Sequence, residues 1–195
     1  FSKTPVFSTK PSVTAYDKGA KGMLIGEGSV MYVLKKFDTA VRDGDQIHAV
    51  IRSCHSSSDG KAPGIYAPTI EGQELALRRA YQHAGVDPAT VTLVEGHGTG
   101  TPVGDAIELT AMKNVLGEGA AKESALGAKR QRVAVGSIKS QIGHLKAMGG
   151  SAGLHKAKED LATVDTNLAN STLNLLREFW TQFIPVGGAY EVPEE

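Results

Sequence analysis

Two segments about forty residues apart share one pattern, and it constrains the fold more than any other feature. Residues 91–94 and 133–135 are short runs rich in valine, and each leads into a stretch of small residues that contains one histidine. A short apolar run bounded by turn residues is typical of a buried strand. The order strand, loop, helix, strand, loop, helix predicts βαβ units on a parallel sheet, and therefore an α/β fold.

The histidines of the two segments are His97 and His144. Ligands of open α/β folds gather outside the carboxyl ends of the strands, so the two turns would aim both imidazoles into one crevice. An imidazole placed there can donate to a carbonyl oxygen and stabilise negative charge as it develops. Lys139 adds a cation that can hold a carboxylate or change the proton affinity of the histidine. The alternative interpretation is that each histidine only caps a helix.

Composition narrows the possible partners and locations. The 21 basic residues are balanced by 21 acidic ones, so nucleic acid and anionic membranes lack their usual electrostatic target, whereas an acidic carrier domain can still bind a local patch. Cys54 is the only cysteine, which excludes an internal disulfide and multi-cysteine zinc sites and fits the cytoplasm. The longest apolar run, residues 30–34, is far shorter than the roughly 20 residues of a membrane span. Phe1 in place of methionine suggests a piece of a longer protein.

Apolar periodicity and turn residues predict the elements along the chain. The expected strands are residues 30–34, covered on both faces, and residues 47–51, 91–94 and 133–135. The expected helices are one turn at 38–41, a helix between the N-cap Thr69 and the C-cap Gly85, a helix at 105–116 ending at Gly117, and helices at 143–161 and 167–183. Residues 1–22 and 117–132 are expected to be exposed loops.

The two histidine segments resemble the two histidine motifs of the β-ketoacyl synthases, the condensing enzymes of fatty-acid and polyketide assembly. The matching runs are EGHGTGTPVGD at 95–105 and GSIKSQIGH at 136–144. Residues 21–28, 43–51 and 67–73 also resemble the family's sequences. The resemblance extends to about Gly153. Residues 1–5 and 58–61 are most similar to the ketosynthase domain of polyketide-type polyunsaturated-fatty-acid synthases.

The resemblance implies a thiolase-like fold with layers of helix, sheet and helix, present here incompletely, as the end of the first half and most of the second. The expected parts are the rear of the amino-terminal half at 1–67, the carboxy-terminal half at 68–160, and a shortened, divergent tail at 161–195. Uncovered sheet edges would then need the rest of a ketosynthase or a second copy of the chain, so a homodimer is expected.

The implied activity is decarboxylative Claisen condensation of malonyl-carrier with an acyl thioester. By resemblance, His97 and His144 polarise the malonyl thioester, and Lys139 supports the second histidine. The other implied site residues are Glu108, near that lysine, and Thr99 and Thr101, which bond the phosphopantetheine arm of an acyl carrier protein. The resemblance implies no metal and no cofactor other than that carrier-bound arm.

The family's nucleophilic cysteine is expected upstream of this chain. Cys54 falls where the family has small residues, which predicts a buried small apolar group. Two alternatives remain open: a catalytically silent ketosynthase-like binding or dimerisation partner, and another acyl-CoA enzyme of the thiolase fold, which would need its own cysteine arrangement. Decarboxylation activity that depends on the histidines separates the first alternative from a live enzyme.

Overall fold

The sheet at the centre of the structure is small. The computed structural model describes residues 6–62, 64, 66–125 and 133–162. Within them, strands β1 (Leu93–Glu95) and β2 (Ala134–Gly136) pair in parallel, with Val94 opposite Val135. Each strand begins within two residues of its predicted run. The parallel pairing confirms the α/β class expected from the order of the elements.

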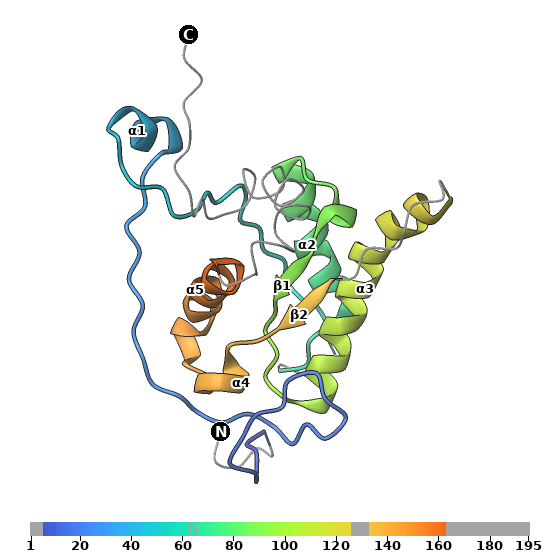
Figure 1. Ribbon diagram of the computed structural model, residues 1–195. Coiled ribbons are helices and arrows are strands. Elements are labelled where there is room, and N and C mark those ends of the chain that lie inside the picture. The colour runs from blue at the N-terminus through green and yellow to red at the C-terminus, as the bar shows by residue number, and fades with distance from the viewer. Residues whose placement is uncertain (1–5, 63, 65, 126–132, 163–195) are drawn as a thin grey trace.

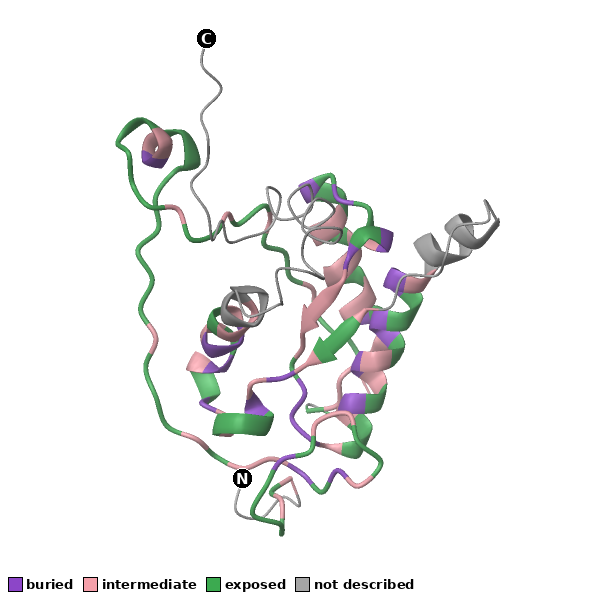
Figure 2. Cartoon of the chain, in the orientation of Figure 1, coloured by how far each residue is buried: buried purple, intermediate pink, exposed green. Residues whose placement is uncertain are grey.

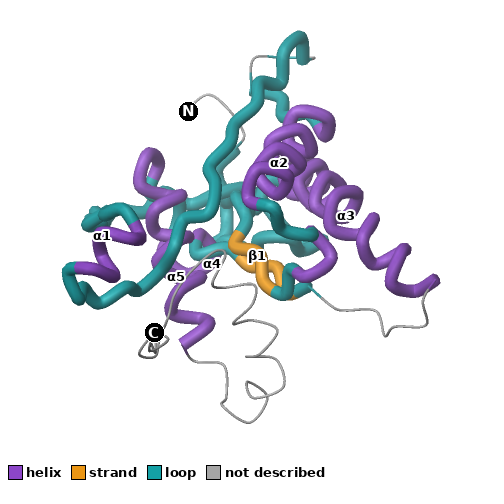
Figure 3. The backbone as a smooth tube through the Cα atoms, turned by 90° about the horizontal axis from the view of Figure 1, so that it is seen from above, coloured by secondary structure: helices purple, strands orange, loops and turns teal. Residues whose placement is uncertain are grey.

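Helices lie on both sides of the strand pair. On one side α2 (Ile70–Ala84) packs against α3 (Pro102–Ala125), and on the other α5 (Gly149–Ala162) contacts β1. Figures 1 and 3 both show the strands between these helices. A short 3-10 helix, η1 (Pro88–Thr90), precedes β1 and contacts α3. The described part of the chain is therefore layered, with helices on either side of a parallel pair of strands.

Helix α2 begins and ends where the sequence predicts. The hydroxyl oxygen of Thr69 accepts a hydrogen bond from the backbone N–H of Gly72 at 3.1 Å, which satisfies one free amide of the first turn. Asp59 in turn accepts from the hydroxyl of Thr69 at 2.7 Å. At the other end Gly85 has a φ of 67°, a left-handed conformation that favours glycine. Both predicted caps are confirmed.

The hydrophobic core lies between α2, α3 and the sheet. Its buried members are Ala84, Val86, Val91, Met112 and Leu116, and the partly buried Leu77, Tyr81, Val94 and Val133 pack against them. Buried and exposed positions alternate along α3 in Figure 2, as expected of a helix with one face on a core. This core fixes α3 relative to β1, and both elements carry residues of the candidate site.

Helix α3 is longer than predicted. It starts at Pro102, a residue favoured in a first turn because its missing N–H would have no partner there. It continues through Gly117, which the sequence predicts as its end, to Ala125. Each glycine inside a helix costs only about 1 kcal/mol, and the alanines that follow Gly117 and Gly119 are strong helix formers. The predicted loop at 117–132 is therefore wrong in its first part, and residues 126–132 lie outside the described residues.

The predicted helix at 143–161 is helical in two pieces, a 3-10 helix η2 (Lys146–Met148) and α5, and a separate short helix, α4 (Lys139–Ile142), ends just before it. The break falls at Gly143, where φ is 75°, and the next N–H, that of His144, donates to Leu24 O at 2.8 Å. This long-range hydrogen bond takes His144 out of the helical path. The predicted helix at 167–183 lies outside the described residues.

The predicted strands at 30–34 and 47–51 are wrong. Both segments are extended without strand pairing, and Met31 and Val33 are 92% and 95% exposed. A strand is defined by hydrogen bonds to a neighbour, and no strand of the described residues lies beside these segments. The apolar residues of these segments therefore predict a buried strand, but among the described residues no neighbouring strand covers them.

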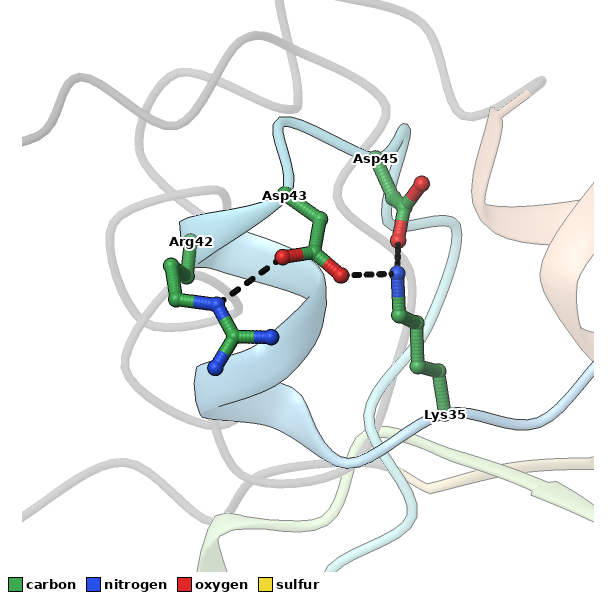
Figure 4. Close-up of polar contacts among 4 residues, drawn as sticks. All are labelled: Lys35, Arg42, Asp43 and Asp45. Atoms are coloured by element: carbon green, nitrogen blue, oxygen red, sulfur yellow. Dashed lines mark hydrogen bonds and ion pairs between the residues drawn. The ribbon is translucent and has the colours of Figure 1, made fainter.

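Helix α1 (Phe37–Arg42) confirms the helical turn predicted at 38–41. Charged groups surround its end, as Figure 4 shows. The Lys35 ammonium contacts Asp43 at 2.7 Å and also contacts Asp45, and Arg42 contacts Asp43 at 2.9 Å. The hydrogen bonds from Lys35 and then Arg42 lower the pKa of Asp43. These pairs are open to solvent, so they orient the turn and contribute little to stability.

Cys54 is exposed, so the prediction that it is a buried small group is wrong. It lies in a segment without regular structure that runs along α2, and its side chain is on the solvent side. Within the described ranges, every helix is too short or too polar to cross a lipid bilayer.

Candidate active site

The two histidines predicted to converge lie side by side. His97 is in the loop after β1, and His144 is in the loop after α4. Their ring centroids are 5.6 Å apart and their planes meet at 87°, an edge-to-face contact. His97 keeps an exposed edge, and His144 is half-buried. The two rings therefore border one site that solvent can reach.

Glu108 on α3 holds the backbone of the His97 loop. Its carboxylate accepts hydrogen bonds from the N–H of His97 at 2.6 Å and from the N–H of Gly98 at 2.9 Å. Hydrogen bonds to a charged acceptor are stronger than neutral ones, and this carboxylate is buried, with 9% of its residue surface exposed. The sequence predicts Glu108 as a neighbour of Lys139; in the structure its hydrogen bonds go to the histidine loop.

Tyr16 and Asp105 complete this clamp, and the sequence analysis assigned neither of them a role. The Tyr16 hydroxyl donates to Glu108 at 2.9 Å, and its backbone N–H donates to Asp105 at 2.7 Å. Asp105 also accepts from the N–H of Gly100 at 3.1 Å. Burial, and next the charge of Glu108, raise the pKa of Tyr16, so the phenol keeps its proton and remains a donor. Tyr16 lies 92 residues from Glu108 in a loop without a motif, so its role could not be recognised from the sequence. Asp105 lies inside the first histidine motif, and its position there could have indicated a role.

His144 is held by the chain segment that precedes the exposed apolar run. Its N–H donates to Leu24 O at 2.8 Å, and its carbonyl accepts from the N–H of Gly26 at 3.1 Å, which forms a parallel bridge. A Cβ at Gly26 would lie 2.0 Å from Ile142 O, so only glycine allows the two backbones to approach this closely. A segment more than one hundred residues away in sequence thus sets the position of the second imidazole.

One nitrogen of the His144 ring has a partner. Nδ1 accepts a hydrogen bond from the backbone N–H of Lys146 at 2.9 Å, so the neutral ring carries its proton on Nε2. Burial, then the charge of Lys139, then that of His97, lower the pKa of His144. The ring is therefore neutral at pH 7, and its one N–H donor is Nε2–H.

The same cation acts on His97. Loss of water around its ring is the largest cause that lowers the pKa of His97, the Lys139 charge is the next, and the charges of Glu108 and Asp105 oppose them. Lys139 itself is 4% exposed. Burial lowers the pKa of Lys139 against the opposing charges of Glu95 and Glu108. The arrangement keeps both imidazoles uncharged as donors close to a buried lysine.

Glu95 links the two motifs. It stands at the end of β1, and its carboxylate accepts from the N–H of Ile138 at 2.6 Å, in the loop that leads to Lys139. The hydroxyl of Ser137 donates to His97 O at 3.2 Å in the same region. The strand pairing, this carboxylate and this hydroxyl all connect the loop of one histidine to the loop of the other.

The two threonines lie in the His97 loop. The hydroxyls of Thr99 and Thr101 are 2.9 Å apart and hydrogen-bond each other. Thr99 is 5% exposed and Thr101 is partly exposed, so Thr101 is the more accessible to a ligand. The structure therefore brings together all six site residues predicted from the sequence, four in the two loops, Glu108 on α3 and Lys139 at the start of α4. Among the described residues, no cluster of three His, Cys, Asp or Glu side chains has the geometry of a metal site.

The fold and the site define an α/β protein in which a parallel strand pair delivers two neutral imidazoles to one place. Residues 48–175 match the family described as "Beta-ketoacyl synthase, C-terminal domain". The chain therefore belongs to the β-ketoacyl synthase family.

Relatives in this family are large synthases. The chain is 69% identical over 160 residues to a polyunsaturated fatty acid synthase polypeptide of Thraustochytrium sp. (strain ATCC 26185 / S-3), a match that covers 80% of the chain and 5% of that polypeptide. It is 41% identical over 155 residues to 6-methylsalicylic acid synthase of Aspergillus terreus (strain NIH 2624 / FGSC A1156), covering 80% of the chain and 8% of the synthase. The chain thus corresponds to a small part of each of these relatives.

Solved structures agree with the family. The ketosynthase from module 6 of the bacillaene synthase of Bacillus subtilis 168 superposes with a TM-score of 0.73 at 38% identity, covering 79% of the chain and 27% of that ketosynthase. A structure described as the PfaC keto synthase–chain length factor superposes with a TM-score of 0.70 at 37% identity, covering 78% of the chain and 16% of that structure. The described residues therefore form part of a ketosynthase fold.

Proposed function

We propose that this chain supplies the malonyl-decarboxylating histidine pair of a β-ketoacyl-[acyl carrier protein] synthase that elongates a fatty-acid or polyketide chain. The observation that carries the proposal is the edge-to-face contact of His97 and His144, with ring centroids 5.6 Å apart. Two neutral imidazoles at this distance can both donate to one small acceptor. Donors aimed at a developing oxyanion each contribute about 3 kcal/mol of transition-state stabilisation.

The chemistry assigned to the pair is loss of carbon dioxide from a malonyl thioester. The bond between the malonyl carboxylate and the α-carbon breaks, CO2 leaves, and the electron pair moves into the thioester carbonyl to give an enolate. The enolate oxygen accepts from Nε2–H of His144 and from an N–H of His97. The α-carbon then attacks an acyl thioester, a carbon–carbon bond forms, and the thiolate of that thioester leaves. Lys139 acts through its charge, which keeps both rings neutral.

The substrate carrier in this proposal is the phosphopantetheine arm of an acyl carrier protein. Hydroxyls suit the amides of such an arm, and Thr101, partly exposed beside His97, is the first candidate contact. Thr99 is buried, so it acts by orienting the hydroxyl of Thr101 at 2.9 Å. The nucleophilic cysteine belongs in this proposal to another part of the synthase, since Cys54 stands in the segment along α2 and outside both histidine loops.

The proposed architecture is part of a thiolase-like fold, with the rear of the first half at 1–67, most of the second half at 68–160 and a divergent tail at 161–195. The exposed run from Met31 to Leu34 supports an assembly with the rest of a ketosynthase or with a second copy, because such a run is normally covered. We propose a homodimeric synthase on this basis.

The test is release of labelled CO2 from malonyl-carrier by the synthase that contains this chain. Replacing His97→Ala or His144→Ala should lower the rate by about a hundredfold or more, the loss expected for one oxyanion donor. His155→Ala is the matched control, since His155 is exposed on α5, and it should leave the rate unchanged.

Two outcomes contradict the proposal. If the intact synthase releases no CO2 from malonyl-carrier, the chain is a silent ketosynthase-like partner that serves binding or dimerisation. If it releases CO2 and both alanine variants keep the wild-type rate, the decarboxylating site lies elsewhere in the synthase.

A further inference from the structure

An open cavity lies at the surface on the outer side of α2, among exposed residues that the proposed reaction does not use. It measures about 430 Å³ and is lined by His55, Arg79, Gln82 and His83. Three of these residues come from the last two turns of α2, whereas His55 comes from the segment that runs along the helix (Figure 3). None of the four is acidic, and each of their side chains has at least one N–H group.

Hydrogen bonds hold the wall of the cavity in place. The segment that carries His55 is joined to α2 by Ser53, whose hydroxyl donates to Ala80 O at 2.8 Å, and by Arg79, which donates to Ser56 O at 3.2 Å. Further along, the Ser57 hydroxyl donates to the carbonyl of Gly72. His55 is therefore fixed on both sides in sequence, and the cavity is part of the fold of this segment.

The bond to Ser56 also orients the guanidinium. It uses one of the five N–H donors of Arg79 and sets the head group at the cavity. The rings of His55 and His83 stand next to it in edge-to-face contact, with centroids 4.8 Å apart. Two acidic residues of the same two elements have other partners: Asp59 accepts from Thr69 at 2.7 Å, and Glu74 pairs with Arg78 at 3.4 Å.

We propose that this cavity binds a phosphate group, either free or as a phosphomonoester. A planar guanidinium gives two parallel donors to a phosphate, and imidazole N–H groups add donors from a second direction. A metal ion is disfavoured, because the fixed cation of Arg79 faces the same space as the two imidazoles. The proposal is independent of the reaction assigned to His97 and His144.

The test is equilibrium dialysis of the full chain against labelled inorganic phosphate, with adenosine 3′,5′-bisphosphate and acetate as competitors. Saturable binding of one phosphate per chain is expected, displaced by the phosphomonoester and not by acetate. Arg79→Gln should weaken binding about tenfold or more, as expected for loss of a charge-assisted pair, and His55→Gln and His83→Gln should each weaken it severalfold. If unlabelled inorganic phosphate displaces the label and adenosine 3′,5′-bisphosphate does not, the site binds the free ion. If both compounds displace the label, the site also binds phosphomonoesters.

The control is Arg78→Gln, which removes the same charge from the neighbouring position of α2 and should leave phosphate affinity within twofold. Far-UV circular dichroism reports whether each variant keeps its helices. If Arg79→Gln does not fold, the phosphate affinities of His55→Gln and His83→Gln test the proposal instead. Absence of saturable binding to the wild-type chain overturns the proposal. Equal weakening by Arg78→Gln and Arg79→Gln also overturns it, since net charge alone would then explain the binding.

Discussion

Glu108→Gln should loosen the His97 loop without unfolding the helix that carries it. The carboxylate accepts three hydrogen bonds, from the N–H groups of His97 and Gly98 and from the Tyr16 hydroxyl. An amide keeps one acceptor oxygen, but its NH2 group faces a donor and its charge is gone. Losing a hydrogen bond to a buried charged acceptor costs about 2–3 kcal/mol, so local opening of the loop should become roughly 30-fold to 150-fold more frequent.

Hydrogen–deuterium exchange of the peptide that contains residues 95–100 measures this opening directly, in the isolated chain or in the whole synthase. Tyr16→Phe removes only one neutral donor and should raise exchange by about one order of magnitude or less. Glu71→Gln, at an exposed position in the first turn of α2, is the matched control and should change nothing in this peptide. If the Glu108→Gln peptide exchanges within twofold of wild type, the carboxylate does not hold the loop.

Two further perturbations test the electrostatics and the close backbone contact. The pKa values of both histidines are lowered from 6.5, so just below pH 6.5 the folded state binds fewer protons than the unfolded state. Stability should therefore fall as the pH drops below 6.5. The decarboxylation rate should also fall on the acid side at a pH below 6.5, where the rings become protonated. Lys139→Gln removes a charge that lowers both values, so the acid limb should move to higher pH in a pH–rate profile; an unmoved limb would refute this. Gly26→Ala places a Cβ 2.0 Å from a carbonyl oxygen and should cost about 2 kcal/mol or more in denaturant unfolding. Gly150→Ala, where a Cβ meets nothing within 4 Å on helix α5, should instead stabilise by up to about 1 kcal/mol, and equal effects would contradict the argument.

The elements that the sequence predicts well are those whose determinants are local. Helix α2 has its N-cap at Thr69 and its C-cap at Gly85, and both signals are read within a few residues of the helix. The strands before the two histidines have the same property, because apolar runs end in glycine-rich turns. The parallel pairing of those strands brings the loops of His97 and His144 to the same edge of the sheet, so this part of their convergence was predictable once the strands were.

The features that the sequence did not predict depend on partners distant along the chain. The run from Met31 to Leu34 has the composition of a strand and no strand beside it among the described residues. Tyr16 gains its role from Glu108, 92 residues away, and nothing in its neighbourhood signals that. The break before His144 depends on a hydrogen bond to Leu24, which outweighs the helical pattern of the surrounding residues.

The site owes its geometry more to backbone contacts than to contacts between side chains. Glu108 and Asp105 bind amides of the His97 loop, Glu95 binds the amide of Ile138, and His144 is fixed through its own N–H and carbonyl. The hydrogen bonds of these carboxylates go to backbone amides, and the rise that Glu108 and Asp105 cause in the pKa of His97 is outweighed by burial and by Lys139. Because a positively charged imidazole pair would repel itself and Lys139, neutrality and close approach require each other. The carboxylates that shape the two loops therefore also permit the 5.6 Å contact on which the proposed chemistry depends.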